Sequence, residues 1–416
     1  MGSAKKSDFA CGIHEMDAAL GKYLSNPASY EKPIRVLVVQ QINRAYRVPL
    51  LKKLSENPDI ELTMVYGTSP PMQAGDVGIS VATGSMPFRT ISGPVSGIRF
   101  KGREILWFGL ALKTIRQDYF DVVICDHYTR LLSIWAMQSI QLRRNANFIL
   151  WGIGFHQYPT PILDRVRMLM VKRTDALLLY SEKESRRYQE MGAPREKCFV
   201  TQNTVDIEGI DAAIRATKQK DILACREKIN VKEGPLLMHV GRLAGNKRLD
   251  LLLRTIPYLQ KKWPGIKLAL IGEGPEHEDL KNLAIELSIS DVVYFLGTIA
   301  DHKLLSPWVL ASDLFVAPAQ IGLMAPMCMI YGKTLAISNE AEQHGPEVQA
   351  FVPGKTGLNY KFGDTQDLAR IISFLLNHPE KCKQFAAAGS TYVREMMGPE
   401  QMLDSFLTAI RYVTGR

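Results

Sequence analysis

The sequence predicts an α/β protein built on doubly wound parallel sheets, and two observations lead to this fold class. Short apolar runs recur along the 416 residues, and most are followed by a turn and then by a stretch with helical spacing of apolar residues. Continuous apolar runs of this kind are typical of buried parallel strands. The chain is also long enough for two domains of ordinary size, each with its own core.

The second half of the chain contains the clearest series of strand–helix units. A strand is predicted at residues 236–240, and the turn after it carries Arg242 and Lys247. The glycines that follow predicted strands here are Gly241, Gly272, Gly297 and Gly322. Ligands of such sheets bind at the carboxyl ends of the strands, so these turns are expected to converge on one crevice. The two cations at a helix start suit a diphosphate, although an ordinary basic loop is an equal alternative.

In the first half, strands are predicted at residues 34–39, 61–66, 121–125, 147–151 and 176–180. Residues 68–97 are rich in Gly, Ser and Pro and predict a long irregular excursion, whereas residues 105–119 predict a helix. The polar side chains that follow the predicted strands are Arg44, Arg47, His127 and His156. For each of these residues a solvated or purely structural role is the alternative to a role in a site.

Several short motifs of the second half occur together in one family. They are Gly241-Arg242-Leu243 with Lys247, Ile271-Gly272-Glu273-Gly274-Pro275, Phe295-Leu296-Gly297, Ala311-Ser312-Asp313-Leu314-Phe315 and Gly354-Lys355-Thr356-Gly357-Leu358. With these motifs, residues 236–358 resemble the nucleotide-sugar-binding half of GT-B glycosyltransferases, specifically the retaining group classed as family 4. The resemblance implies two Rossmann-like domains that face each other across a cleft. Residues 1–206 would bind the acceptor, residues 207–398 would bind the nucleotide sugar, and a helix at 399–416 would cross back to the first domain.

The resemblance also assigns roles to residues. Arg242 and Lys247 would hold the donor diphosphate, and His127 would line the cleft near the donor sugar. The backbone around Gly297 would lie against the nucleotide base. The backbone amides that would face the phosphate and sugar belong to Gly322, Leu323 and Met324. Arg44 or Arg47 would meet the donor phosphates or the acceptor, and His156 is a weaker cleft candidate.

One departure from the family pattern concerns two glutamates that usually bind the donor sugar and the ribose. Ala319 and Met327 stand at these positions, and neither side chain accepts strong hydrogen bonds from hydroxyls. The chain resembles a subgroup that lacks this pair and carries a His-Gly-Pro-Glu segment, here residues 344–347. We therefore expect Glu347 or Glu340, together with Gln320, to recognise the hydroxyls. The alternative is that both glutamates are loop or cap residues.

Composition narrows the functional classes. The net charge is +9, but the basic residues are not clustered as in a nucleic-acid-binding module. Residues 98–108 and 165–173 combine basic and apolar side chains, which suits either contact with an anionic membrane or ordinary amphipathic elements. The six cysteines show no paired spacing, and no apolar run reaches the ~20 residues that span a bilayer. The N-terminus also lacks the apolar core of a signal peptide.

These features predict a cytoplasmic enzyme and leave open an association with the cytoplasmic face of the membrane. It would move a sugar from a nucleotide diphosphate sugar to a saccharide or lipid-linked acceptor, without a metal or other cofactor, in surface polysaccharide or glycolipid assembly. A non-catalytic nucleotide-sugar-binding protein is one alternative, because the glutamate pair is missing. A nucleotide-sugar epimerase or a phosphorylase of the same architecture is another. A dinucleotide oxidoreductase is disfavoured, since no Gly-x-Gly-x-x-Gly follows the first strand.

Overall fold

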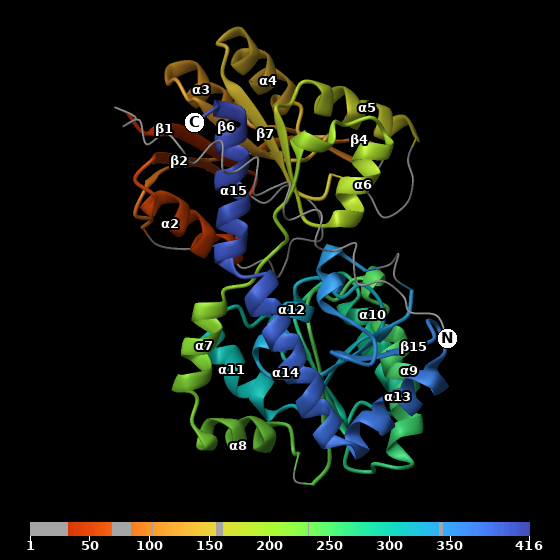
Figure 1. Cartoon of the computed structure of the whole chain (residues 1–416). Coiled ribbons are helices and arrows are strands. Elements are labelled where there is room, and N and C mark those ends of the chain that lie inside the picture. Colours follow the sequence, from red (N-terminus) through yellow and green to blue (C-terminus); the bar gives the residue numbers. More distant parts are fainter. Residues whose placement is uncertain (1–31, 69–84, 101–102, 155–160, 232, 341–343) are drawn as a thin grey trace, which may run out of the picture.

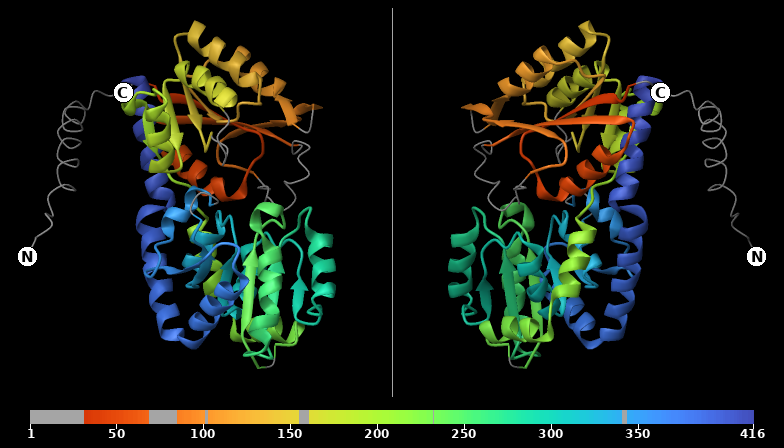
Figure 2. Two further views of the ribbon diagram at one scale, coloured as in Figure 1. Left: turned by 90° about the vertical axis from the view of Figure 1, so that its right-hand side faces the viewer. Right: turned by 90° about the vertical axis from the view of Figure 1, so that its left-hand side faces the viewer.

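The computed structural model describes residues 32–68, 85–100, 103–154, 161–231, 233–340 and 344–416. These residues form two α/β domains, which lie one above the other in Figure 1. Figure 2 shows the same arrangement from two sides. Each domain is built on one sheet whose strands are all parallel. The predicted fold class, with two doubly wound Rossmann-like domains, is therefore confirmed.

The N-terminal domain contains a seven-stranded sheet with the order β3-β2-β1-β6-β7-β8-β9. Its strands are β1 (Ile34–Gln40), β2 (Ile60–Gly67), β3 (Arg89–Gly93), β6 (Val122–Asp126), β7 (Asn147–Trp151), β8 (Ala176–Leu179) and β9 (Cys198–Val200). Its helices are α2 (Val48–Glu56), α3 (Gly109–Gln117), α4 (Ser133–Arg143), α5 (Pro161–Lys172) and α6 (Glu182–Glu190). A separate antiparallel hairpin joins β4 (Ser96–Phe100) to β5 (Arg103–Trp107).

The central strand β1 explains why this sheet carries helices on both faces. Val36 and Val38 belong to one core cluster, whereas Leu37 and Val39 belong to another, and all four side chains are buried. Successive side chains of a strand point to opposite faces, so an unbroken apolar run requires cover on both sides. One face packs on α2 and the other on α3 and α4.

The C-terminal domain contains a six-stranded sheet with the order β12-β11-β10-β13-β14-β15. Its strands are β10 (Leu236–Val240), β11 (Lys267–Ile271), β12 (Val293–Phe295), β13 (Leu314–Ala317), β14 (Leu335–Ser338) and β15 (Gly357–Tyr360). Its helices are α7 (Ile207–Ala216), α8 (Gln219–Lys228), α9 (Leu249–Gln260), α10 (His277–Glu286), α11 (His302–Ala311), α12 (Met324–Ile330), α13 (Thr365–Asn377) and α14 (Pro379–Met396).

The last helix, α15 (Pro399–Thr414), returns to the N-terminal domain (Figures 1 and 2). Its apolar side chains Met402, Phe406 and Ile410 are buried in the same core cluster as strands β1 and β6. The Phe406 ring meets the Trp151 ring edge-on, with 4.9 Å between centroids. Burial of a large aromatic side chain of this kind dominates the energetics of its contact, so α15 is an integral part of that domain.

Two sequence expectations in the first half were wrong. Residues 105–107 belong to strand β5, and the predicted helix begins at Gly109 in α3 rather than at residue 105. The excursion at 68–97 also contains an edge strand, β3, whose side chains are mostly exposed and therefore lack an apolar run. Both short strands depend on pairing with distant partners, which local composition does not encode.

Candidate active site

The strand ends of the C-terminal sheet meet closely. The Gly272 N–H donates to the Gly297 carbonyl at 2.8 Å, and the Gly241 N–H donates to the Ile271 carbonyl at 2.9 Å. A Cβ atom at position 272 would lie 1.9 Å from the Gly241 carbonyl oxygen, and φ there is +139°. Glycine is required at such a position because any side chain would collide with the neighbouring backbone. Gly241, Gly272 and Gly297 thus line one edge of the sheet.

The basic turn after β10 joins this edge to the loop after β13. The Lys247 Nζ donates to the Gln320 carbonyl at 2.7 Å, and the Asn246 and Gln320 side chains hydrogen bond to each other. A Cβ atom at Gly322, where φ is +57°, would lie 3.8 Å from the Lys247 Nζ. Leu323 and Met324 follow at the start of α12. The structure therefore brings the lysine and the Gly322 loop together.

Lys247 is half-buried in this loop. Burial lowers the pKa of Lys247 to about 8, the charge of Arg242 acts in the same direction, and the charge of Glu347 opposes both. Arg242 and Glu347 therefore lie within electrostatic range of this ammonium. A half-buried cation close to a second cation is poorly compensated and favours an anionic ligand.

Glu347 lies in a short 3-10 helix, Pro346–Ala350, and only 6% of its surface is exposed. Its Oε1 accepts a hydrogen bond from the Asn203 Nδ2 at 2.8 Å, and Asn203 lies between β9 and α7. Two residues further on, the Gln349 Nε2 donates to the Tyr180 carbonyl at 2.9 Å. The Glu347 segment thus joins the donor side of the molecule to the carboxyl end of the N-terminal sheet.

Glu340 has a different setting, because it is exposed just after β14. His344 returns toward the same strand, where its Nε2 lies 3.1 Å from the Ser338 Oγ. Ala319 is fully buried and Met327 belongs to a core cluster. Both positions are therefore filled by apolar packing.

On the N-terminal side, His127 follows β6 and is buried. Its backbone N–H donates to the Trp151 carbonyl at 2.8 Å, and its Nδ1 lies 3.1 Å from the Tyr188 hydroxyl oxygen. Burial lowers the pKa of His127 to about 3, and the positive charge of Arg167 acts in the same direction. The ring is therefore neutral near pH 7 and carries one donor and one acceptor nitrogen.

The two arginines after β1 differ in their surroundings. The Arg47 Nη1 donates to the Asp126 Oδ1 at 2.7 Å, and its Nη2 donates to the Tyr180 hydroxyl at 2.7 Å. Its guanidinium also lies 3.9 Å from the centre of the Trp151 ring. The guanidinium of Arg47 thus already has protein partners, whereas the sequence predicted a contact with phosphates or acceptor. Arg44 is half-buried, and His156 lies outside the described residues.

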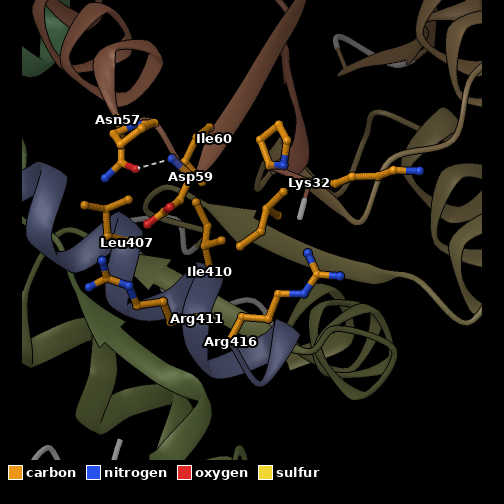
Figure 3. A pocket seen from close by; sticks show the side chains of 11 residues that line it. Lys32, Asn57, Asp59, Ile60, Leu407, Ile410, Arg411 and Arg416 are labelled. Atoms are coloured by element: carbon orange, nitrogen blue, oxygen red, sulfur yellow. Dashed lines mark hydrogen bonds between the residues drawn. The ribbon is translucent and has the colours of Figure 1, made fainter. Parts of the chain in front are cut away.

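Hollows also lie at other points of the described part of the molecule. Figure 3 shows a pocket of about 150 Å³ between the starts of β1 and β2 and helix α15, lined by Lys32, Asp59, Leu407, Ile410 and Arg411 among others. It lies at the amino ends of the strands and therefore away from the edge that carries His127. A second hollow, of about 820 Å³, is lined from both domains, by α2, the start of α7 and the Ala300–Asp301 loop.

Comparisons with known proteins connect this arrangement to a function. Residues 222–391 match the family model "Glycosyl transferases group 1". A glycosyltransferase of Haemophilus influenzae is 24% identical over 352 residues, which cover 84% of this chain and 90% of the relative. The chain is a glycosyltransferase. A lipopolysaccharide core biosynthesis glycosyltransferase of Rhizobium meliloti, LpsE, is 25% identical over 67% of this chain and 74% of its own length.

Solved structures confirm the fold of this glycosyltransferase. The HepE protein of Anabaena in complex with UDP superimposes with a TM-score of 0.68 at 15% identity, over 90% of this chain and 98% of that one. The glycosyltransferase therefore has the predicted GT-B fold. Among the residues that the structure describes, no group of His, Cys, Asp and Glu side chains is arranged to hold a metal ion. Within the same ranges, every helix is too short or too polar to cross a bilayer.

Sequence reasoning missed several residues of this region. Tyr188 in α6 contacts His127, and Tyr180 at the end of β8 contacts Arg47. Gln349 in the Glu347 segment bonds to the Tyr180 carbonyl. Tyr188 stands in a polar helix whose sequence gives no sign of a functional residue. Asn203 and Glu347 are 144 positions apart in the sequence, so only the structure shows the bond between them.

Proposed function

We propose that this glycosyltransferase moves a sugar from a nucleotide diphosphate sugar to a saccharide or lipid-linked acceptor, with retention at the anomeric carbon. Residues 207–398 bind the donor, and residues 1–206 bind the acceptor. The observation that carries the proposal is the approach of the half-buried Lys247 ammonium to Arg242, Glu347 and the Gly322 loop at the carboxyl ends of the strands. The likeness to a structure that contains UDP and to a lipopolysaccharide core transferase supports a role in cytoplasmic surface polysaccharide or glycolipid assembly.

The chemistry follows from this charge distribution. As the bond from the sugar to the diphosphate breaks, negative charge grows on the leaving diphosphate. Lys247, Arg242 and the amides of Gly322, Leu323 and Met324 stabilise that charge without rearranging, which is the largest single source of catalysis in many enzymes. Cationic side chains supply this stabilisation, so no metal ion is required. The backbone at Gly241, Gly272 and Gly297 admits the nucleotide because no side chain stands in its way.

Glu347 recognises the donor sugar hydroxyls in this proposal, in place of the missing glutamate pair. Its bond to Asn203 fixes one carboxylate oxygen, and the charge of Lys247 lies close by. A carboxylate held in this way accepts strong hydrogen bonds from hydroxyls. Gln320 is hydrogen bonded to Lys247 and Asn246 and therefore lies close to the same site. Glu340 is exposed, so we assign it a smaller part in recognising the hydroxyls.

Donor binding is expected to weaken as the pH rises from about 7 to about 9. The diphosphate of a nucleotide sugar keeps its charge over this range, so the protein supplies the titrating group. Lys247 has a pKa of about 8 in the free protein. A bound diphosphate raises that pKa, so binding takes up a proton above pH 8 and affinity falls there, by up to about tenfold per pH unit. Titration of the donor by calorimetry at each pH measures this slope. Lys247→Arg keeps its charge and should flatten it; an unchanged slope would contradict the assignment.

The acceptor side has a surface that suits an anionic bilayer. Ile162 and Leu169 of α5 are 78% and 54% exposed, and Arg165 and Lys172 are also exposed at helical spacing between and beyond them. Apolar and basic side chains on one helix face bind the headgroup region together. We expect the chain to sediment with anionic vesicles.

A paired replacement tests that surface. Ile162→Ser with Leu169→Ser is expected to weaken vesicle binding about tenfold. The control is Leu304→Ser, which removes a leucine that is 65% exposed on α11 of the other domain. Equal vesicle binding by all variants would contradict membrane contact through α5.

A metal-free donor screen tests the function itself. The purified chain is melted with UDP-, GDP-, ADP- and dTDP-sugars, and nucleotide release and the anomeric configuration of the product are followed by NMR. A donor that binds raises the melting temperature as its concentration exceeds the dissociation constant. The missing glutamates at Ala319 and Met327 favour one other candidate, a non-catalytic nucleotide-sugar-binding protein. A melting shift without turnover on any acceptor would support that candidate instead.

A further inference from the structure

His127 and Tyr188 form a buried pair at the carboxyl edge of the N-terminal sheet. The Tyr188 hydroxyl oxygen lies 3.1 Å from the His127 Nδ1, and the two rings are stacked with 5.7 Å between centroids. Tyr188 is fully buried in α6 and belongs to a core cluster of the N-terminal domain, and His127 is also buried. The loop after β6 therefore positions His127, and helix α6 positions Tyr188.

The backbone after β7 is shaped around this pair. A Cβ atom at Gly154 would lie 2.0 Å from the Tyr188 hydroxyl oxygen and 2.4 Å from the His127 Nδ1. Gly154 also has a φ of +66°, which glycine adopts readily. Close packing on both sides restricts rotation of the imidazole, so its two nitrogens have fixed directions.

The chemistry of the two groups decides which of them donates. The imidazole is neutral, and of two neutral partners the phenol is the stronger acid while the imidazole nitrogen is the stronger base. The stronger of the two possible arrangements is therefore a hydrogen bond from the Tyr188 hydroxyl to the His127 Nδ1. The single N–H of the ring must then be on Nε2.

The Nε2 atom has no partner among the described residues, although it is buried. An unsatisfied buried donor is costly and calls for an explanation, such as a ligand that completes it. The edge of the sheet that carries His127 is also the edge that meets the other domain, because Tyr180 at the end of β8 contacts Gln349 there. A ligand at this edge would lie between the two domains.

We propose that Tyr188 is a positioning residue that fixes His127 as an Nε2–H donor to a hydroxyl of the bound sugar. This inference rests on the proposed function, because it requires that a sugar binds at this site. It assigns a role to a residue of α6 that does not itself touch the substrate. Tyr188 acts by choosing which imidazole nitrogen carries the proton and where that nitrogen points.

The tautomer can be measured without any substrate. In protein with ¹³C- and ¹⁵N-labelled histidine, the ring nitrogen shifts distinguish Nε2–H from Nδ1–H, and His127→Gln identifies the His127 signals by their loss. We expect the Nε2–H form in the wild-type chain. An Nδ1–H ring would overturn the proposal whether or not the chain transfers sugars.

Kinetics of Tyr188→Phe test the consequence. This change removes one hydroxyl, so the His127 ring loses the group that orients it. We expect kcat to fall about tenfold with a smaller change in the donor KM, since the lost hydrogen bond from the ring matters most in the transition state. Tyr294→Phe is the control, because it removes a hydroxyl bonded to the Asp291 carbonyl before β12, away from the site. Turnover equal to wild type in Tyr188→Phe would overturn the proposal and leave the proposed function intact. Absence of turnover in wild type itself would instead refute the proposed function, while the tautomer still tests the pair.

Discussion

Replacing Lys247 with alanine is expected to slow sugar transfer by about 10²–10³-fold, the range found when one preorganised donor to a developing anion is removed. Lys247 is the cation that the structure ties most firmly to the Gly322 loop, through its bond to the Gln320 carbonyl. Lys247 is half-buried, so the dielectric around its ammonium is lower than that of water and its effect on a diphosphate is larger. The initial rate of nucleotide release with the donor found in the screen measures the loss. Arg242→Ala is expected to act in the same direction.

Lys333 provides the matched control. It is another half-buried lysine, its pKa is lowered mainly by burial, and its Nζ donates to the Leu310 carbonyl at 3.0 Å. It stands before β14, at the amino edge of the same sheet. Lys333→Ala should lower the melting temperature without changing the rate per folded molecule. If Lys247→Ala and Lys333→Ala kept equal rates, the diphosphate site would have to lie elsewhere.

The donor side could be predicted from the sequence because its features are local. An apolar run followed by glycine predicts the end of a buried strand, and the carboxyl ends of parallel strands lie at the same edge of the sheet. Gly241, Gly272 and Gly297 therefore lie on one edge, as their order along the chain suggested. Lys247 was placed beside Gly322 by the same logic, since the turns after β10 and β13 belong to neighbouring strands.

The glutamates and the acceptor side could not be predicted in the same way. Glu340 and Glu347 stand in one polar stretch, and only their folded surroundings separate an exposed residue from one bonded to Asn203. Tyr188 reaches His127 across elements that are 61 positions apart in the sequence. Long-range contacts of this kind depend on how helices pack against the sheet, which residue spacing does not reveal.

Arg47 shows that an arginine in a loop after a strand is compatible with two different roles. A strand followed by a loop with two arginines predicts a contact with phosphate, and Arg44 is half-exposed as that prediction requires. Arg47, however, is 2% exposed and bonded to Asp126. A buried guanidinium needs a carboxylate partner, and the partner stands at the end of a neighbouring strand. The sequence contains both residues but does not pair them.

Replacing Arg47 with methionine is therefore expected to destabilise the fold by about 3–5 kcal/mol, because Asp126 would be left as a buried charge without its guanidinium. The Tyr180 hydroxyl and the Trp151 ring would lose the same partner. Urea denaturation followed by tryptophan fluorescence measures the change in the free energy of unfolding. The control is Arg44→Met, from a half-buried arginine whose Nη1 lies 3.5 Å from the Tyr46 hydroxyl, where a change of about 0.5 kcal/mol is expected.

A double replacement separates the two explanations for Arg47. Arg47→Met combined with Asp126→Asn removes both charges, so it should recover part of the stability that Arg47→Met loses, since the penalty comes mainly from the unpaired carboxylate. A structural arginine predicts this partial rescue. An arginine that contacts the donor or acceptor predicts the reverse: Arg47→Met would stay stable, and its donor or acceptor KM would rise. Unfolding and kinetic data on Arg47→Met, Arg44→Met and the double variant therefore decide whether the loop after β1 belongs to the core of the N-terminal domain or to the active site.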